Sequence, residues 1–163
     1  RVTVVARGDV FTVPAKHGAV RKLTDSSGVH ERGATWSPDG KWIAYLSDAS
    51  GEFELHLRSQ DGRGEPTALT TGADTYYFNP VWSPDSKKLL WADRKQRLRY
   101  VDIETKTVSL VAENPQTPIT QFAWSPDSQW ITWVKAGVSA FGRLQLHRLA
   151  DGTNHEVTDG WYD

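Results

Sequence analysis

The sequence predicts an all-β fold made of repeated antiparallel sheets, and three observations support this prediction. The tetrapeptide Trp-Ser-Pro-Asp occurs three times, starting at Trp36, Trp82 and Trp124, with spacings of 46 and 42 residues. The segments after the turns are apolar at successive positions, whereas a strand with one wet face would alternate. No segment keeps a 3.6-residue apolar period. The repeat length is near that of propeller blades, so we expect a β-propeller fragment of about 3.75 four-stranded antiparallel blades with almost no helix.

Each copy of the tetrapeptide has the composition of a tight turn between two strands. Pro38 fixes φ for the second turn position, Asp39 suits the third, and Gly40 tolerates positive φ. Ser86 and Ser128 replace the glycine, so these corners are either strained or use a different final angle. Equivalent aspartates lie one per blade, too far apart to act as an acid–base pair. We therefore assign a structural turn role to Trp36, Pro38, Asp39, Trp82, Pro84, Asp85, Trp124, Pro126 and Asp127.

The remaining segments complete the blades in order. Residues 1–24 match only the second, third and fourth strands of the repeat, because the first strand and its turn have no counterpart there. Complete blades are expected over residues 34–70, 80–111 and 122–158. Residues 159–163 lead towards a further blade. The whole chain is thus expected to be a single partial propeller over residues 1–163, with fewer blades than a closed ring normally needs.

Composition excludes several functional classes. The chain has 163 residues, 19 basic and 20 acidic side chains and a net charge of −1, so nothing favours a nucleic-acid partner. It has no apolar run of the roughly 20 residues a membrane helix needs, so no membrane partner is expected. There is no cysteine, the five histidines lack metal-ligand spacing, and no Gly-x-Ser-x-Gly elbow occurs. We expect no metal, no cofactor and no catalytic residue, and the basic stretch 94–99 is interpreted as a solvated hairpin.

The loops that lead into the blades are the best candidates for binding. They cover residues 28–34, 72–80 and 114–122, with 159–163 as a shortened fourth, and in a propeller they gather on one rim. Aromatic side chains with an arginine suit extended peptides, because they offer flat contact area and a partner for a terminal carboxylate. The alternative is that Tyr77 or Phe78 simply packs between blades. The candidate peptide-binding residues at the channel rim are His30, Arg32, Tyr76, Tyr77, Phe78, Trp161 and Tyr162.

The order of motifs resembles a known family. "RGDVFTVPAKHGAVRKLT", "WSPDGKWIAYLSDASGEFELHLR", "PVWSPDSKKLLWAD", "FAWSPDSQW" and "VTDGWYD" together are similar to the seven-bladed propeller of tricorn-type proteases. Members are large, cytosolic, oligomeric serine peptidases that trim oligopeptides, and this propeller is thought to filter peptides on their way to the active site. The resemblance implies a non-catalytic segment, with oligopeptides, the remaining blades and the catalytic domains as partners. It also implies a cytoplasmic location.

Two other functions fit the same repeats. The propeller could dock proteins, as in the periplasmic Tol system, which would place it in the periplasm. It could instead be the lid of a prolyl-oligopeptidase-type hydrolase. Under any of these functions, the faces and strand edges at the two ends of the fragment would be open. We therefore expect the isolated chain to self-associate through its open blade edges.

Overall fold

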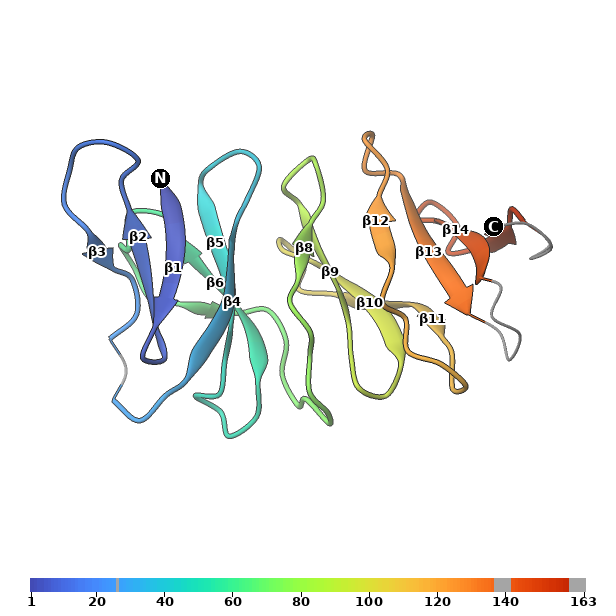
Figure 1. The fold of residues 1–163 in the computed structure, drawn as a ribbon, viewed down its shortest axis with the longest axis horizontal. Helices are drawn as coiled ribbons and strands as arrows, with labels where there is room; N and C mark the ends of the chain where they lie inside the picture. The colour runs from blue at the N-terminus through green and yellow to red at the C-terminus, as the bar shows by residue number, and fades with distance from the viewer. Residues whose placement is uncertain (26, 137–141, 159–163) are drawn as a thin grey trace.

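The computed structural model describes residues 1–25, 27–136 and 142–158 and contains four antiparallel sheets (Figure 1). The first sheet consists of β1 (Val2–Ala6), β2 (Asp9–Val13) and β3 (Arg21–Lys22). The second consists of β4 (Glu31–Trp36), β5 (Trp42–Ser47), β6 (Glu54–Ser59) and β7 (Thr67–Ala68). The third consists of β8 (Val81–Trp82), β9 (Lys88–Ala92), β10 (Arg97–Asp102) and β11 (Val108–Glu113). The fourth consists of β12 (Phe122–Trp124), β13 (Trp130–Ala136), β14 (Gly142–Arg148) and β15 (Asn154–Glu156).

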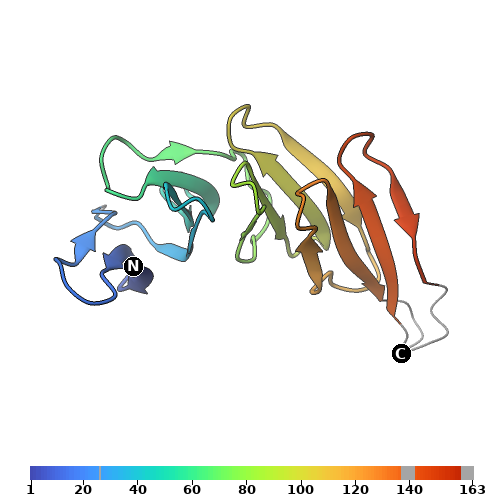
Figure 2. The same cartoon turned by 90° about the horizontal axis from the view of Figure 1, so that it is seen from above.

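In every sheet the strands lie in sequence order and neighbouring strands are antiparallel. Figure 2 shows the four sheets fanned along an open arc. No described residue lies in a helix, and so none belongs to a helix that could cross a membrane. The structure confirms the prediction of an all-β, antiparallel propeller fragment. Two strands extend beyond the blade bounds expected from the sequence, because β4 begins at Glu31 and not at residue 34, and β11 ends at Glu113 and not at residue 111.

The core lies in the seams between adjacent sheets. The second and third sheets bury a cluster that contains Leu46, Leu55, Trp82 and Trp91, and the third and fourth bury one that contains Leu90 and Trp133. A smaller cluster, formed by Val10, Leu23, Ile43 and Tyr45, joins the first sheet to the second. Strands in the middle of the array are therefore apolar on both faces.

Strand β9 contributes apolar side chains to the seams on both of its faces. Leu89 and Trp91 pack towards the second sheet, whereas Leu90 and Ala92 pack towards the fourth. Side chains alternate across a strand, so successive apolar residues fill opposite seams. This packing on both faces explains why apolar and polar residues do not alternate in the sequence of β9.

The repeated turns have one geometry. In the first, Ser37 Oγ donates a hydrogen bond to Asp39 Oδ1 over 2.6 Å, and the Gly40 N–H donates to the Ser37 carbonyl over 2.9 Å. The equivalent Ser–Asp bonds are 2.6 Å at Ser83 and 2.5 Å at Ser125. These serine hydroxyls hold the pKa values of Asp39 and Asp127 below the ordinary value.

The serines at the fourth turn position adopt positive φ, 61° at Ser86 and 59° at Ser128. Of the two options left open by the sequence, the turn thus keeps the glycine-like angle. Each hydroxyl also accepts a hydrogen bond of 3.0 Å across a seam, Ser86 from the Asp39 N–H and Ser128 from the Asp85 N–H. The bond across the seam offsets part of the backbone cost.

Candidate functional site

The loops that precede β4, β8 and β12 lie at the end of the array opposite the Trp-Ser-Pro-Asp turns (Figure 1). We call this end the rim. The geometry follows from the four-stranded repeat, because each chain reversal alternates between the two ends. The hairpin between β5 and β6 therefore also opens at the rim and contributes Phe53.

Arg32 lies at the centre of the rim. Its guanidinium carbon is 4.3 Å from the centre of the Phe53 ring and 3.9 Å from the centre of the Tyr76 ring. Arg32 Nη2 donates a hydrogen bond of 2.7 Å to the Tyr77 carbonyl. No carboxylate among the described residues pairs with Arg32, and its Nε atom is buried without a partner. Burial lowers the pKa of the Arg32 guanidinium, so the cation is held partly desolvated.

A bulge in β4 lets Arg32 reach this position. The register with β5 shifts between Arg32 and Thr35, and Gly33 has φ of 64°. A β-carbon at Gly33 would lie 2.7 Å from Asn79 Oδ1, so the neighbouring loop approaches the bare backbone closely. Only glycine satisfies both the angle and the contact.

The loop of residues 72–80 is tied down by an ion-pair network. Arg97 Nη2 lies 2.5 Å from Asp74 Oδ1, and Lys95 Nζ lies 2.6 Å from Asp74 Oδ2. The fully buried Asp93 carboxylate accepts hydrogen bonds from Arg97 Nε and Arg99 Nη2 over 2.8 and 2.7 Å. The hydrogen bond from Arg97 is the main reason that the pKa of Asp74 is lowered.

The interpretation of residues 94–99 as a solvated hairpin holds for the exposed turn residues Arg94 and Lys95, but not for the arginines that follow them. The side chains of Arg97 and Arg99 are only 19% and 16% exposed, and both are engaged with carboxylates. Asp93 follows β9 directly, and the tight reversal after it brings the arginines of β10 back alongside. The basic stretch therefore supports the loop that carries Tyr76.

A pocket of about 480 Å³ opens beside Arg32. Its walls come from all three connecting loops and the end of β9, and they include Arg32, Tyr76, Phe78, Asn79, Ile119 and Phe122. The aromatic rings of Tyr76 and Phe78 are 5.6 Å apart, and these side chains are 41% and 44% exposed. A concave apolar surface with one cation suits a ligand that has both apolar groups and a negative charge.

The structure groups the predicted rim residues unevenly. Arg32, Tyr76 and Phe78 line the pocket, whereas His30 does not line it and has its ring 6.1 Å from Phe53. Tyr77 is a correction: its side chain is 3% exposed, lies 5.5 Å from Trp91 and faces the core, as the alternative interpretation held. Burial raises the pKa of Tyr77. Trp161 and Tyr162 lie outside the described residues.

Sequence reasoning missed Phe53, Asn79, Ile119 and Phe122. Phe53 could have been found, because the reversal after a second strand returns to the rim end. The other three lie inside or beside the loops already singled out, but nothing in their residue type marks them as pocket walls. Of the described residues, no three His, Asp or Glu side chains form a group that could hold a metal ion.

The whole chain, residues 1–163, matches the family model of the tricorn protease second beta propeller domain. The chain belongs to this family. The tricorn protease homolog 1 of Streptomyces coelicolor is 26% identical over 160 residues, which cover 95% of this chain and 15% of the relative. The crystal structure of the tricorn protease superposes with a TM-score of 0.82 at 16% identity, over 98% of this chain and 16% of that one.

Propellers outside the tricorn family share the fold. TolB from Acinetobacter baumannii superposes with a TM-score of 0.66 at 17% identity, and the match covers 92% of this chain and 37% of TolB. This chain spans about one seventh of the length of its Streptomyces relative, because the match covers 15% of that protein.

Proposed function

We propose that this chain is a non-catalytic propeller segment of a tricorn-like serine peptidase in the cytoplasm, where it guides or sieves oligopeptides towards a catalytic domain elsewhere in the parent protein. The remaining blades and the catalytic domains would be its partners. The family match and the peptidase relatives support the assignment of the parent. The pocket beside Arg32 is the observation that supports peptide binding.

The chemistry of Arg32 favours peptides with a free carboxylate. The rings of Phe53 and Tyr76 both pack against it, and its Nη2 atom is engaged by the Tyr77 carbonyl. The cation has lost water without gaining a carboxylate partner among the described residues. A carboxylate that enters the pocket would supply this partner, and charge-assisted hydrogen bonds contribute about 1.5–3 kcal/mol.

Phe78 and Phe122 would contact the apolar side chains of the same peptide. Both belong to the pocket walls but to different loops, so an extended chain could lie across them. The terminal carboxylate and a neighbouring apolar side chain would then be recognised together. We expect selection for the end of a peptide, with modest preference among apolar residues near it.

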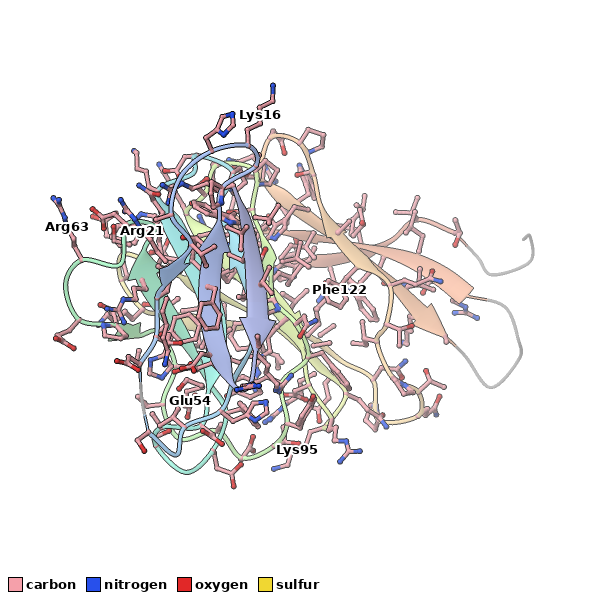
Figure 3. All side chains as sticks on the ribbon, turned by 60° about the vertical axis from the view of Figure 1, so that its left-hand side comes forward. Lys16, Arg21, Glu54, Arg63, Lys95 and Phe122 are labelled. Carbon is pink, nitrogen blue, oxygen red and sulfur yellow. The ribbon has the colours of Figure 1, made fainter. Side chains whose placement is uncertain are left out.

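A binding measurement on the isolated chain tests this function. Fluorescence anisotropy would compare one labelled hexapeptide with a free C-terminus and the same peptide as its amide. We expect the amide to bind at least tenfold more weakly, and Arg32→Gln to remove this difference. Arg63→Gln is the matched control, because Arg63 lies in solvent away from the pocket residue Phe122 (Figure 3).

Three outcomes would contradict the proposal. Equal binding of acid and amide by the wild-type chain would exclude carboxylate recognition. Peptide hydrolysis by the purified chain alone would show that it is catalytic. Capture of folded proteins in a pull-down, with no retention of short peptides, would favour a docking propeller.

A further inference from the structure

The basic stretch of residues 94–99 contains a cation that the fold does not neutralise. Three of its four basic side chains pair with the carboxylates of Asp74 and Asp93, namely Lys95, Arg97 and Arg99. Both oxygens of Asp74 are already engaged by these cations. Arg94 is the exception, because no carboxylate among the described residues lies within ion-pair distance of it. Its guanidinium is therefore available to a carboxylate from outside.

Backbone pairing places the Arg94 side chain on the face of the pocket. Tyr77 forms an antiparallel bridge with Asp93, and the Arg94 N–H donates a hydrogen bond of 3.0 Å to the Tyr76 carbonyl. Arg94 thus lies opposite Tyr76. Because side chains alternate across a strand, Tyr77 and Asp93 point into the core, whereas Arg94 shares a face with Ala92. Ala92 and Tyr76 both line the pocket, so Arg94 lies at its border.

The Tyr76 ring lies against two cations that lack a carboxylate. The guanidinium carbon of Arg32 is 3.9 Å from the centre of this ring, and that of Arg94 is 5.8 Å from it. The two carbons are therefore at most 9.7 Å apart, which is the sum of these distances. An aromatic face attracts a cation without neutralising it. Two like charges at this spacing favour a ligand that carries two negative groups.

We propose that the rim selects peptides whose C-terminal residue is Asp or Glu, and that Arg94 determines this preference. Arg32 binds the terminal carboxylate, and Arg94 binds the side-chain carboxylate of the same residue. These two carboxylates are only a few bonds apart, which suits two guanidiniums held against one ring. The inference rests on the proposed function, because it needs the end of the peptide to be seated at Arg32.

The two arginines should contribute unequally to affinity. Arg94 is exposed, whereas Arg32 is half-buried. Water and salt screen an exposed ion pair more strongly than a partly desolvated one. We therefore expect the acidic side chain to improve affinity about three- to fivefold, which is less than the effect of the terminal carboxylate.

Paired peptides test the role of Arg94. Fluorescence anisotropy would compare two labelled hexapeptides that have free C-termini and differ only in the last residue, Glu or Gln. We expect the Glu peptide to bind about three- to fivefold more tightly to the wild-type chain, and this ratio to fall to about one in Arg94→Gln. The substitution leaves the backbone N–H of residue 94 in place for its bond to Tyr76. Arg63→Gln, which removes the same charge far from Phe122, should leave the ratio unchanged (Figure 3).

A salt titration of the wild-type chain gives a second test that needs no variant. Raising the salt from about 50 mM to about 0.5 M should bring the ratio of the Glu and Gln affinities close to one, because the Arg94 pair is exposed. A ratio that does not change with salt would contradict an ion pair at this position.

The inference is overturned if the Glu and Gln peptides bind the wild-type chain equally, or if Arg94→Gln leaves their ratio unchanged. An equal fall of the ratio in Arg63→Gln also overturns it, because net charge and not contact would then set the preference. The amide of the Glu peptide separates this inference from the proposed function. If the acid is preferred to the amide while Glu and Gln bind equally, only the role of Arg94 fails. If acid and amide bind equally, or no peptide binds, both fail.

Discussion

The hydrogen bonds that cross the seams make a quantitative prediction at Ser86. Its hydroxyl is the acceptor for the Asp39 N–H at 3.0 Å, its φ is 61°, and the residue is 6% exposed. Ser86→Ala removes the bond but keeps the positive φ, so it should cost about 1 kcal/mol of unfolding free energy. Ser86→Gly also removes the bond, but relief of the backbone recovers about 1 kcal/mol. The glycine variant should therefore resemble wild type.

A substitution at Gly40 measures separately how much a positive φ costs a residue with a β-carbon. Its φ is 72°, and no atom lies within 4 Å of a β-carbon built there. Gly40→Ala should cost about 1 kcal/mol through the backbone alone. Comparison of the two sites separates the hydrogen bond at Ser86 from the strain.

Urea unfolding measures both effects. With a slope of about 2 kcal/mol/M, a loss of 1 kcal/mol lowers the midpoint by about 0.5 M. We expect this shift for Ser86→Ala and Gly40→Ala, with unchanged slopes and no shift for Ser86→Gly. If Ser86→Ala unfolds at the wild-type midpoint while Gly40→Ala is destabilised, the bond across the seam contributes nothing and the reasoning is refuted.

Three further predictions concern the loops, the buried charges and the ends of the fragment. Gly33→Ala should lower the free energy of unfolding by about 2 kcal/mol, because the residue has positive φ and the added β-carbon would lie 2.7 Å from Asn79 Oδ1. Gly28→Ala is the control in thermal unfolding, because Gly28 also has positive φ but has open space around it. Equal losses of stability in the two variants would contradict the bulge argument. Burial lowers the pKa values of His56 and His147 below 6.5, so the unfolded state binds protons more readily than the folded state does. The contribution of these two histidines to the free energy of unfolding is therefore fully present above pH 6.5 and is lost as the pH falls through the folded pKa values. His147→Gln should flatten the dependence of stability on pH between pH 7 and 5, measured by urea titrations. Sedimentation velocity should show association that increases with chain concentration, whereas a monomer at every concentration would disprove open-edge association.

Much of the fold could be predicted because the same pattern of turn and apolar strand occurs three times in the sequence. Trp36, Trp82 and Trp124 set the period, and the apolar residues of β9 on both faces required a sheet on either side. The serine hydrogen bonds across the seams could not be predicted, because they join residues 43 and 47 positions apart. The sequence showed only that Ser86 and Ser128 were unusual at a glycine position.

The candidate site could be predicted only as a set of loops. Successive chain reversals alternate between the two ends of a blade, which placed Arg32, Tyr76 and Phe78 on one rim. The composition of a loop does not indicate which of its aromatic side chains points into the core. Tyr77 turns into the core because its backbone forms a bridge with Asp93, which fixes its direction. The bulge at Gly33 and the ion pairs of Asp93 are likewise tertiary features, without a local signal in the sequence.

The two ends of each blade serve different purposes, and the repeat reveals which is which. At the turn end a serine–aspartate hydrogen bond closes every copy, and further hydrogen bonds join neighbouring copies, so serine, proline, aspartate and tryptophan recur at equivalent positions. At the rim the loops are joined by contacts of their own, such as the hydrogen bond from Arg32 to the Tyr77 carbonyl, and their residues differ from blade to blade. Arg32 differs from the repeated turns in that it is a partly desolvated cation with no carboxylate partner among the described residues, and the proposed peptide ligand would supply that partner.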